Sequence, residues 1–490
     1  MTKYAIVIGA GVSGLAIAIR MAKKGYSVSV FEKNETAGGK LGELKMNGFR
    51  FDTGPSLLTL PNLLHELSDG IPDNRLKSPE IVRLDNICKY FFADGTLINA
   101  WSDPVRFAKE VADKTTVPAK RILRFLNENK VLYQLTSDLF LFSPFQKLRT
   151  FFRREIVKIG FNLHRLKMLR TMHSVNARFF TDPQIVQLFD RYATYNGSNP
   201  YQAPATLNMI AHLEHNTGAF LPSEGMYSIV RHLIELCEYY KVKINFRTPV
   251  TKVLTESKAV IGVVAGGKTV DADIVINATD INYAKTHLFA ELSKRIRSSK
   301  IQYSTSAYIF YWGIDRKYKN LDIHNILFSS DYRAEFEALF SSKTVYHDPT
   351  VYIYISSKIN PADAPNGCEN WFVMVNAPSI GQNSEVDVNM VKNYVVEKIR
   401  NTLDIAIDRH IVTEGVRTPE TIQTETNSVA GAIYGASSNS IFSAFLRQPN
   451  FSRRIKGLYF TGGSVHPGGG IPLCLASAKI VANLNPDISE

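Results

Sequence analysis

The sequence predicts an α/β fold in which a Rossmann-type sheet is assembled from separate parts of the chain, with an inserted α+β domain and a helical segment that faces a membrane. Three features carry this prediction. Glycine-rich turns that lead into a helix stand near both ends of the 490-residue chain, at 9–14 and 462–470. A helix and short strands alternate over 222–280, and a basic, aromatic stretch fills 139–180.

The composition is that of a folded globular protein, because 45% of the residues are hydrophobic and 21% are charged. The four cysteines form no CxxC pair, so we expect neither a disulfide framework nor a metal site, and reduced thiols favour the cytoplasm. The uncharged run 4–19 resembles a secretion signal, but regularly spaced glycines and Arg20 interrupt it. No later stretch reaches the roughly 18 apolar residues of a membrane-spanning helix.

The N-terminal segment has the pattern of a strand–turn–helix–strand unit. A short apolar, β-branched run at 4–8 predicts a buried strand, and a helix is expected over 13–24. A second strand follows over 26–31. The turn at 9–14 reads GAGVSG, in the position that dinucleotide-binding units give to their phosphate-binding loop.

Each residue type in this turn has a physical role. Gly9 permits the tight turn, Gly11 lets the backbone approach a pyrophosphate, and Gly14 lets the helix pack against the strand. The N-terminus of the helix offers free N–H groups and a positive dipole end to the phosphates. Glu32 comes 18 residues after Gly14, where a carboxylate accepts hydrogen bonds from ribose hydroxyls and disfavours the 2′-phosphate of NADP.

A second glycine pair, Gly38-Gly39, follows Glu32 and precedes Lys40. Simple NAD dehydrogenases do not need this pair, which suits a second backbone approach to the pyrophosphate with the Lys40 ammonium as a positive charge. Soon afterwards, a strand ends in a turn that contains Gly54 and Pro55. We therefore expect these five residues to contact the cofactor.

The segment 222–280 predicts a return of the chain to the same domain. A helix over 223–240 is followed by strands near 242–247, 250–256, 259–265 and 269–276, with a hairpin signal at Gly266-Gly267. Val250 begins a strand directly after a proline, where a backbone contact to adenine is expected.

The C-terminal segment predicts a third part of the same domain. A buried strand over 455–460 leads into the glycine-rich loop, and a helix follows over 473–483. Glycines ahead of a helix N-terminus let the backbone approach a flat ligand and aim the helix dipole at it. The expected contacts are Gly462, Gly463, Gly470 and Ile471.

Taken together, these motifs resemble the bacterial-type carotenoid desaturases, the phytoene desaturase family of FAD enzymes. The resemblance is carried by IVIGAGVSGLAIAIRMAKKGYSVSVFEKN, GGK with FDTGPSLLTLP, YNGSNPYQAPATLN and LYFTGGSVHPGGGIPLCLASAK. HPGGGIP separates this family from most amine oxidases, and GGKLGE with GPSLLTLP is more similar to the branch that desaturates hydroxylated carotenoids at the 3,4 position. The resemblance implies an FAD-binding domain of the glutathione-reductase/amine-oxidase type and a carotenoid substrate.

The order of the motifs divides the chain into five parts. The FAD-binding domain is expected to comprise 1–85, 220–285 and 411–490. A helical region that contacts substrate and membrane occupies 86–219, and the β-sheet part of the substrate domain occupies 286–410.

The sheet part contains alternating aromatic and apolar runs. Those at 303–312, 351–356 and 371–375 are typical of strands in a half-buried sheet. Such strands suit the wall of an apolar tunnel for a long polyene, although aromatic residues of this kind also form ordinary cores.

The resemblance implies dehydrogenation of a C–C bond beside a polyene, with a hydride passing to flavin and a proton leaving the neighbouring carbon. The conjugated chain stabilises the allylic cation, so no strong protein base is required. His466 is the candidate for assisting proton transfer, with a structural hydrogen bond as the alternative. Cys474 stands where a covalent flavin link could be considered, and we interpret it as a small buried residue at a helix start.

The basic, aromatic stretch has large apolar residues interspersed with Lys147, Arg149, Arg153, Arg154, Lys158, Arg165, Lys167 and Arg170. This combination suits an amphipathic segment that binds an anionic membrane surface through 139–178. We therefore expect a cytoplasmic protein, peripheral on the inner face of the cell membrane. A helical cap with a solvated basic face is the alternative. No nucleic-acid motif accompanies the charge, so we expect no nucleic-acid partner.

Other functions remain compatible with the sequence. They are phytoene desaturase, carotenoid isomerase using FAD without net redox change, flavin amine or porphyrinogen oxidase, and a non-catalytic flavin- or lipid-binding protein. The final electron acceptor, oxygen or a quinone, is left open by the sequence.

Overall fold

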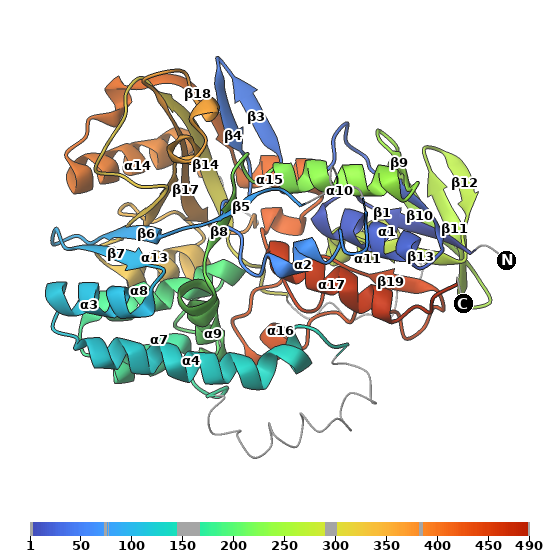
Figure 1. Ribbon diagram of the computed structural model, residues 1–490, viewed down its shortest axis with the longest axis horizontal. Coiled ribbons are helices and arrows are strands. Elements are labelled where there is room, and N and C mark those ends of the chain that lie inside the picture. The colour runs from blue at the N-terminus through green and yellow to red at the C-terminus, as the bar shows by residue number, and fades with distance from the viewer. Residues whose placement is uncertain are drawn as a thin grey trace.

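The computed structural model describes residues 3–72, 76, 78–144, 167–289, 301–381 and 386–488. Figure 1 shows two halves, a parallel sheet with its covering helices at one end of the molecule and a larger mixed sheet at the other. We call them the Rossmann half and the mixed-sheet half.

The core of the Rossmann half is a five-stranded parallel sheet in the order β19-β13-β1-β2-β9. Its strands come from three distant parts of the chain, as the recurring motifs predict. They are β1 (Tyr4–Ile8), β2 (Ser27–Phe31), β9 (Lys243–Asn245), β13 (Ile274–Asn277) and β19 (Leu458–Phe460).

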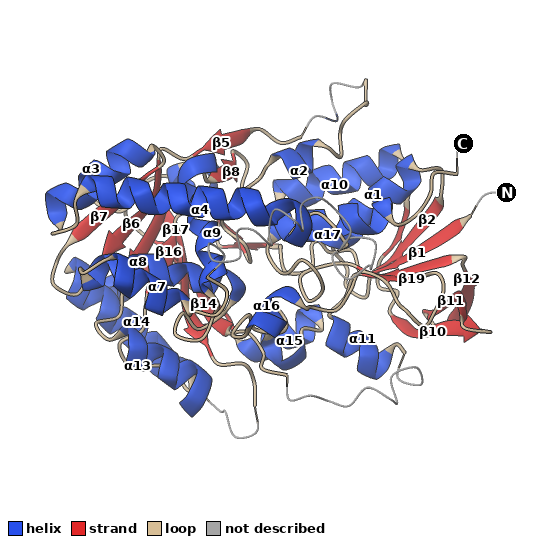
Figure 2. Cartoon of the chain, turned by 90° about the horizontal axis from the view of Figure 1, so that it is seen from below, coloured by secondary structure: helices blue, strands red, loops and turns tan. Residues whose placement is uncertain are grey.

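Both faces of this sheet are covered. Three helices pack together on one face, namely α1 (Val12–Lys23), α10 (Ser228–Tyr239) and α17 (Ile471–Asn483). A three-stranded meander shares an apolar core with the other face, and it consists of β10 (Val250–Glu256), β11 (Ala259–Ala265) and β12 (Lys268–Asp271). Figure 2 shows the meander beside the parallel strands.

The strand expected over 269–276 is two strands. β12 ends at Asp271 as the edge of the meander, and β13 begins at Ile274 in the parallel sheet. The amide of Ala272 still donates to Ile261 of the meander, whereas the amide of Asp273 donates to Tyr4 of β1. The chain therefore changes sheets between these two residues, a change that periodicity alone does not reveal.

The mixed-sheet half contains a seven-stranded sheet in the order β18-β14-β17-β16-β15-β6-β7. Neighbouring strands are antiparallel except β15 and β6, which are parallel. The strands are β6 (Asn86–Phe91), β7 (Leu97–Trp101), β14 (Ser306–Ile314), β15 (His324–Leu327), β16 (Val351–Tyr354), β17 (Glu369–Ala377) and β18 (Ile411–Arg417).

The centre of this sheet is buried on both faces. All nine residues of β14 are buried. Phe310 and Trp312 join the core beneath helix α14 (Val388–Leu403), whereas Ile309 and Tyr311 face the large core shared with the Rossmann half. The strands predicted from alternation are present, and they are more deeply buried than the half-buried sheet that we expected.

Helices and short strands complete the fold. The helices are α2 (Asn62–His65), α3 (Pro104–Lys114), α4 (Ala119–Phe140), α7 (Met172–Phe179), α8 (Pro183–Asp190), α9 (Met209–His212), α11 (Ile281–His287), α13 (Tyr332–Glu337), α15 (Pro419–Thr426) and α16 (Ile441–Phe445). The short strands are β3 (Glu43–Met46), β4 (Phe49–Asp52), β5 (Ile81–Arg83) and β8 (Phe220–Pro222). None of the helices in the described ranges is long and apolar enough to cross a bilayer.

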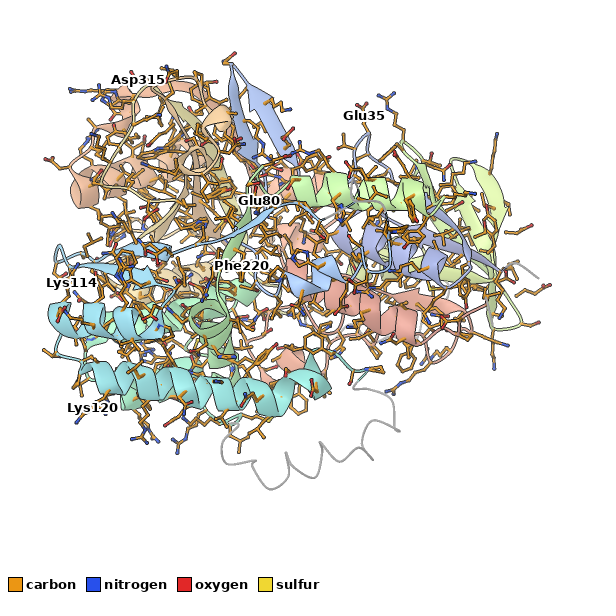
Figure 3. All side chains as sticks on the ribbon, in the orientation of Figure 1. Glu35, Glu80, Lys114, Lys120, Phe220 and Asp315 are labelled. Carbon is orange, nitrogen blue, oxygen red and sulfur yellow. The ribbon has the colours of Figure 1, made fainter. Side chains whose placement is uncertain are left out.

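Three strands of the mixed sheet lie in segments that we assigned to other parts of the chain. Strands β6 and β7, within the expected helical region 86–219, belong to the mixed sheet, as does β18 at the start of the expected FAD-binding part 411–490. Their backbones complete the edges of that sheet, a pairing between distant segments that the sequence does not display. Strands β5 and β8 pair where the chain passes between the halves, near the labelled Glu80 and Phe220 in Figure 3.

Candidate functional site

A cavity of about 540 Å³ is lined by residues of both halves. At one end it is lined by Glu32 and Val250 of the Rossmann half, and at the other by Ile326 and Phe372 of the mixed sheet. This volume lies within the usual range of small-molecule sites. The glycine turns and the strand-borne aromatic residues that the sequence singled out therefore line a common space.

The turn between β1 and α1 has the geometry of a phosphate-binding loop. Gly9 has φ +99°, which favours glycine. A Cβ on Gly14 would lie 2.0 Å from the carbonyl oxygen of Gly9, so Gly14 is needed for close packing; it does not line the cavity. Gly11 lines the cavity, and the nearest atom to a Cβ built on it is 4.0 Å away.

Glu32 lies at the end of β2 and is buried. Its Oε2 accepts a hydrogen bond from the amide of Ala10 at 2.7 Å, and its Oε1 accepts one from the amide of Asn34 at 3.0 Å. The carboxylate thus fixes the glycine turn as well as lining the cavity. The sequence predicted its position but not this second role.

The second glycine pair adjoins the first turn. Gly38 and Gly11 form a β-bridge, and the amide of Gly38 donates to Ala10. Gly38, Gly39 and Lys40 all line the cavity. A Cβ on Gly54 would lie 2.0 Å from the carbonyl oxygen of Lys40, so this loop packs against the turn that carries Gly54 and Pro55, which also line the cavity.

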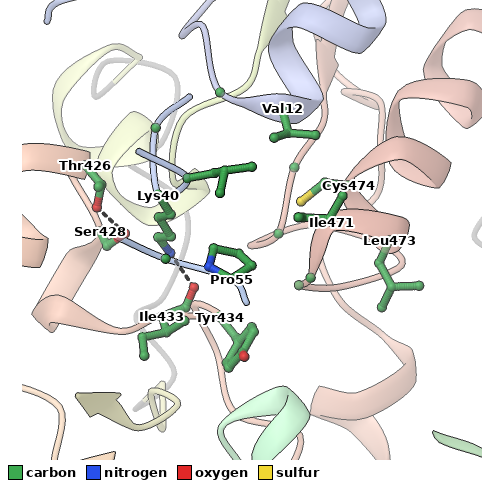
Figure 4. A pocket seen from close by; sticks show the side chains of 18 of the residues that line it. Val12, Lys40, Pro55, Thr426, Ser428, Ile433, Tyr434, Ile471, Leu473 and Cys474 are labelled. Carbon is green, nitrogen blue, oxygen red and sulfur yellow. Dashed lines mark hydrogen bonds between the residues drawn. The ribbon is translucent and has the colours of Figure 1, made fainter. Parts of the chain in front are cut away.

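The Lys40 ammonium is engaged differently from our expectation of a phosphate partner. Its Nζ donates to the carbonyl oxygens of Ala432 and Ile433, and Figure 4 shows the bond to Ile433. Burial lowers the pKa of Lys40 to about 8, while the charge of Asp280 acts in the opposite direction. Lys40 therefore ties the second glycine loop to the 432–433 segment.

The C-terminal loop approaches the same space from α17. Gly462, Gly463, Gly470 and Ile471 line the cavity, and the side chains of Ile471 and Cys474 lie near Val12 of α1 in Figure 4. Gly470 is the N-cap of α17 with φ +101°, and no side chain caps the helix. Helix α1 likewise begins at Val12 after Gly11 without a side-chain cap. Two helix N-termini therefore meet the cavity, the arrangement that stabilises anionic groups.

These residues fit a bound FAD. Apart from the adjoining residues of the chain, no atom of the described residues lies closer than 4.0 Å to a Cβ built on Gly11 or Gly470, so glycine leaves room for a ligand against the backbone. The two uncapped helix starts provide amide donors, and Glu32 provides the acceptor. Val250 lines the cavity at the expected adenine end.

His466, the candidate for proton transfer, does not line the cavity. It is buried, and its Nε2 donates to the carbonyl oxygen of Ser143 at 3.0 Å. The geometry thus favours the structural alternative.

Cys474 does line the cavity, but burial raises the pKa of its thiol to about 11, so the neutral thiol dominates near pH 7.

The mixed-sheet end contributes hydrogen-bonding groups that the sequence analysis did not identify. Arg191 Nη2 donates to Glu214 Oε1 at 3.3 Å and to the hydroxyl of Tyr90 at 2.6 Å. Tyr195 also donates to Glu214. Tyr195 belongs to the YNGSNP segment, but only the packed structure places it against this buried ion pair.

A second polar group lies on strands β15 and β16. The hydroxyl of Tyr352 lies 2.6 Å from Ser56 Oγ and 2.7 Å from His324 Nδ1. All three residues line the cavity, and Ser56 directly follows the turn of Gly54 and Pro55. Ser56 lies in the quoted GPSLLTLP motif, whereas no sequence pattern marks His324 or Tyr352.

Comparison with known proteins identifies the family. The sequence pattern described as flavin containing amine oxidoreductase matches residues 12–484. The chain belongs to this family. FAD is therefore its cofactor, and it is an FAD-dependent oxidoreductase.

Among the flavin-containing amine oxidoreductases, two proteins similar to this chain are named for the compounds on which they act. The chain is 45% identical over 99% of both chains to 1-hydroxycarotenoid 3,4-desaturase of Flavobacterium sp. strain P99-3. It is 30% identical to 4,4'-diapolycopene oxygenase of Methylomonas sp., over 97% of this chain and 96% of the other. The resemblance to carotenoid desaturases, including its 3,4 branch, is thereby confirmed.

Solved structures confirm the fold. An oxidoreductase from Methanosarcina mazei superposes with a TM-score of 0.64 at 16% identity, covering 98% of this chain and all of that one. Wild-type putrescine oxidase bound to putrescine superposes with a TM-score of 0.62 at 12% identity, covering 99% and 98%. The amine-oxidase-type fold predicted for the FAD-binding domain is therefore present.

Proposed function

We propose that this flavoenzyme desaturates a carotenoid, introducing the 3,4 double bond of a hydroxylated acyclic or monocyclic substrate. The observation that carries the proposal is the cavity that joins the FAD site to the apolar face of the mixed sheet. The 45% identity to a protein named 1-hydroxycarotenoid 3,4-desaturase supports the position of the bond. FAD, when bound, accepts the hydride that such a desaturation releases.

The described residues have three tasks in this reaction. The glycine turns and the helix starts bind the cofactor. The apolar side chains of Ile309, Ile326, Phe372 and Met374 line the mixed-sheet end and exclude water from the reacting bond. The rigid sheet orients the polyene, because its strands are buried on both faces.

The test is an anaerobic single turnover of the FAD-loaded protein in liposomes. The substrates are a 1-hydroxylated carotenoid, phytoene and the unhydroxylated analogue of the first. We expect the hydroxylated carotenoid to bleach the oxidised flavin and to gain one conjugated double bond. Conversion of phytoene alone would indicate that the protein catalyses the first desaturation step instead. Oxygen incorporation in air would favour the oxygenase chemistry named for the Methylomonas relative, and unchanged flavin with every carotenoid would contradict the proposal.

We also propose that the protein is cytoplasmic and binds the inner membrane surface through the basic stretch 139–178. Residues 145–166 of this stretch lie outside the described residues. Two observations at its described flanks support the proposal. Leu141, which follows α4, lines the cavity, and Leu169 is 93% exposed. A substrate dissolved in a bilayer would then reach the cavity from that side.

Charge removal tests the membrane proposal. The triple variant Arg153→Gln/Arg154→Gln/Lys158→Gln should bind anionic vesicles about 100-fold less tightly, because each basic residue near such a surface contributes about 1 kcal/mol. Co-sedimentation with vesicles of phosphatidylserine and phosphatidylcholine measures this. The control Lys241→Gln/Lys258→Gln/Lys268→Gln removes three exposed charges from the Rossmann half. Equal loss in both triples would show a general charge effect and exclude a local binding segment.

A further inference from the structure

The mixed-sheet end of the cavity is largely apolar, but among the described residues that line it His324 and Arg191 each have a buried nitrogen without a hydrogen-bond partner, and the nitrogen of His324 belongs to a neutral ring. His324 lines the cavity and is 3% exposed. Its Nε2 has no hydrogen-bond partner among the residues that the structure describes. A buried polar atom left unpaired costs about 1–3 kcal/mol, so a ligand that supplies the missing bond recovers this free energy.

The ring of His324 is held in one orientation. Nδ1 bonds the hydroxyl of Tyr352 at 2.7 Å, and that hydroxyl bonds Ser56 at 2.6 Å. The ring also stacks on Tyr354 with 5.1 Å between centroids and 16° between planes. A fixed ring presents Nε2 at a fixed place, which is what selective recognition requires.

The chemistry of this site suits a neutral hydroxyl. Burial, with the nearby charge of Arg191, lowers the pKa of His324 to about 3, so the ring is neutral near pH 7. If Tyr352 donates to Nδ1, then Nε2 carries the proton and donates; if Nδ1 donates to Tyr352, then Nε2 accepts. An alcohol matches either case. Arg191, whose charge acts on His324, forms an ion pair with Glu214 at 3.3 Å, so the two side chains together carry no net charge that would select a carboxylate or an amine.

The position of the site agrees with the bond that is desaturated. Ser56, at the start of this hydrogen-bonded chain, directly follows the Gly54-Pro55 turn at the FAD site. In a 1-hydroxylated substrate, the carbon that bears the hydroxyl is two bonds from the 3,4 bond. The group that recognises the hydroxyl must therefore lie beside the FAD site, as His324 does through Tyr352 and Ser56.

We propose that His324 Nε2 binds the hydroxyl group of the substrate and thereby selects the hydroxylated polyene over its unhydroxylated analogue. This inference rests on the proposed function. His324 acts as a specificity-determining residue, and Tyr352 and Ser56 act as the residues that position it.

The experiment compares variants of His324 in the FAD-loaded full chain. The measured quantity is the ratio of kcat/KM for a 1-hydroxylated carotenoid to that for the analogue lacking only the hydroxyl. His324→Phe keeps a ring without nitrogen and should lower the ratio at least about 10-fold. His324→Gln carries an amide that reaches the Nε2 position and should restore most of the ratio. His324→Asn reaches only the Nδ1 position and should not restore it.

The control Leu327→Ile, on the same strand but in the core beneath α14 and away from the cavity, should keep the wild-type ratio. The inference would be overturned if His324→Phe and His324→Asn, both with FAD bound, retained the wild-type ratio, or if the wild type showed no preference while converting both substrates. A wild type that holds FAD and converts neither carotenoid would instead overturn the proposed function, and this inference with it.

Discussion

Gly11 shows how a single missing side chain defines the cofactor site. Its φ of −70° and ψ of 172° are open to any residue, so alanine adds no backbone strain there. The added methyl group would enter the cavity, since the nearest atom of the described residues, apart from the adjoining residues of the chain, is the Gly38 carbonyl oxygen at 4.0 Å. The need for glycine at this position therefore arises from the ligand and not from the fold.

We accordingly expect Gly11→Ala to weaken FAD binding by at least about 10-fold, since backbone approach to the pyrophosphate requires glycine there. The stability of the FAD-free protein should stay the same. Titration of the apoprotein with FAD, followed by flavin fluorescence, measures the first quantity, and thermal melting of the apoprotein measures the second. Unaltered affinity would mean that the cofactor does not approach this turn.

Where spacing specifies a turn, the sequence predicts which residues gather around the cavity. Twelve of the fourteen predicted cofactor contacts are glycines or other residues in recognisable turns, and of the fourteen only Gly14 does not line the cavity. The sequence does not reveal contacts between residues that are remote from one another in the chain. Lys40 meets the carbonyl oxygens of Ala432 and Ile433, almost four hundred residues away, and His324 meets Tyr352 across two strands.

At the scale of elements, His466 joins two segments that are distant in the chain. It lies in the loop between β19 and α17, and its bond to the Ser143 carbonyl oxygen holds the segment that follows α4. Leu141 in that segment lines the cavity. His466 is therefore expected to act on the position of the cavity wall and not on the reacting atoms.

His466→Ala should lower the free energy of unfolding by about 1–3 kcal/mol, because a buried hydrogen bond is lost. Turnover at saturating FAD should fall by less than about 10-fold. Urea denaturation and single-turnover flavin bleaching measure the two effects. His466→Gln, which can still donate, should recover most of the stability. Loss of all turnover with FAD still bound would contradict this structural role and would indicate that His466 takes part in proton transfer.

The element pattern was predictable in the Rossmann half, because each strand there is followed by its helix or turn. Helix α1 was expected over 13–24 and spans Val12–Lys23, and β10 and β11 have the predicted bounds. The mixed sheet was harder to predict. Its edge strands β6, β7 and β18 come from segments assigned elsewhere, because pairing of distant strands depends on the folded backbone and leaves no periodic signal in one sequence.

At the scale of the whole molecule, five buried histidines make the fold sensitive to acid. Burial lowers the pKa values of His212, His215, His232 and His466 to about 4 and that of His324 to about 3. Below about pH 6.5, the unfolded chain therefore binds more protons than the folded chain. The free energy of unfolding should fall as the pH falls from about 6.5 to about 4.

Glu335 acts in the opposite direction, because burial raises its pKa to about 7 and its contribution favours the folded state at lower pH. Burial also raises the pKa values of Asp190, Asp280 and Asp363, whereas, against the effect of burial, its hydrogen-bonding partners lower the pKa of Glu110 to about 2. With five histidines and Glu110 against these four carboxyls, net destabilisation in acid should prevail. Urea denaturation of the apoprotein across this pH range measures the slope. His232→Asn should make it shallower, whereas the exposed His347→Asn should leave it unchanged. A slope that is flat in the wild type would contradict the predicted protonation states.

The strand order of the parallel sheet also governs when the enzyme can mature during its synthesis. β1 is made first, but its neighbour β13 pairs on its far side with β19, which ends at Phe460, and α17 packs on α1 only later still. A nascent chain that ends before Leu458 therefore lacks β19, the glycine-rich loop 462–470 and α17, and its parallel sheet has an open edge at β13. FAD is therefore expected to bind after translation is nearly complete, so cells short of flavin should accumulate full-length, colourless protein.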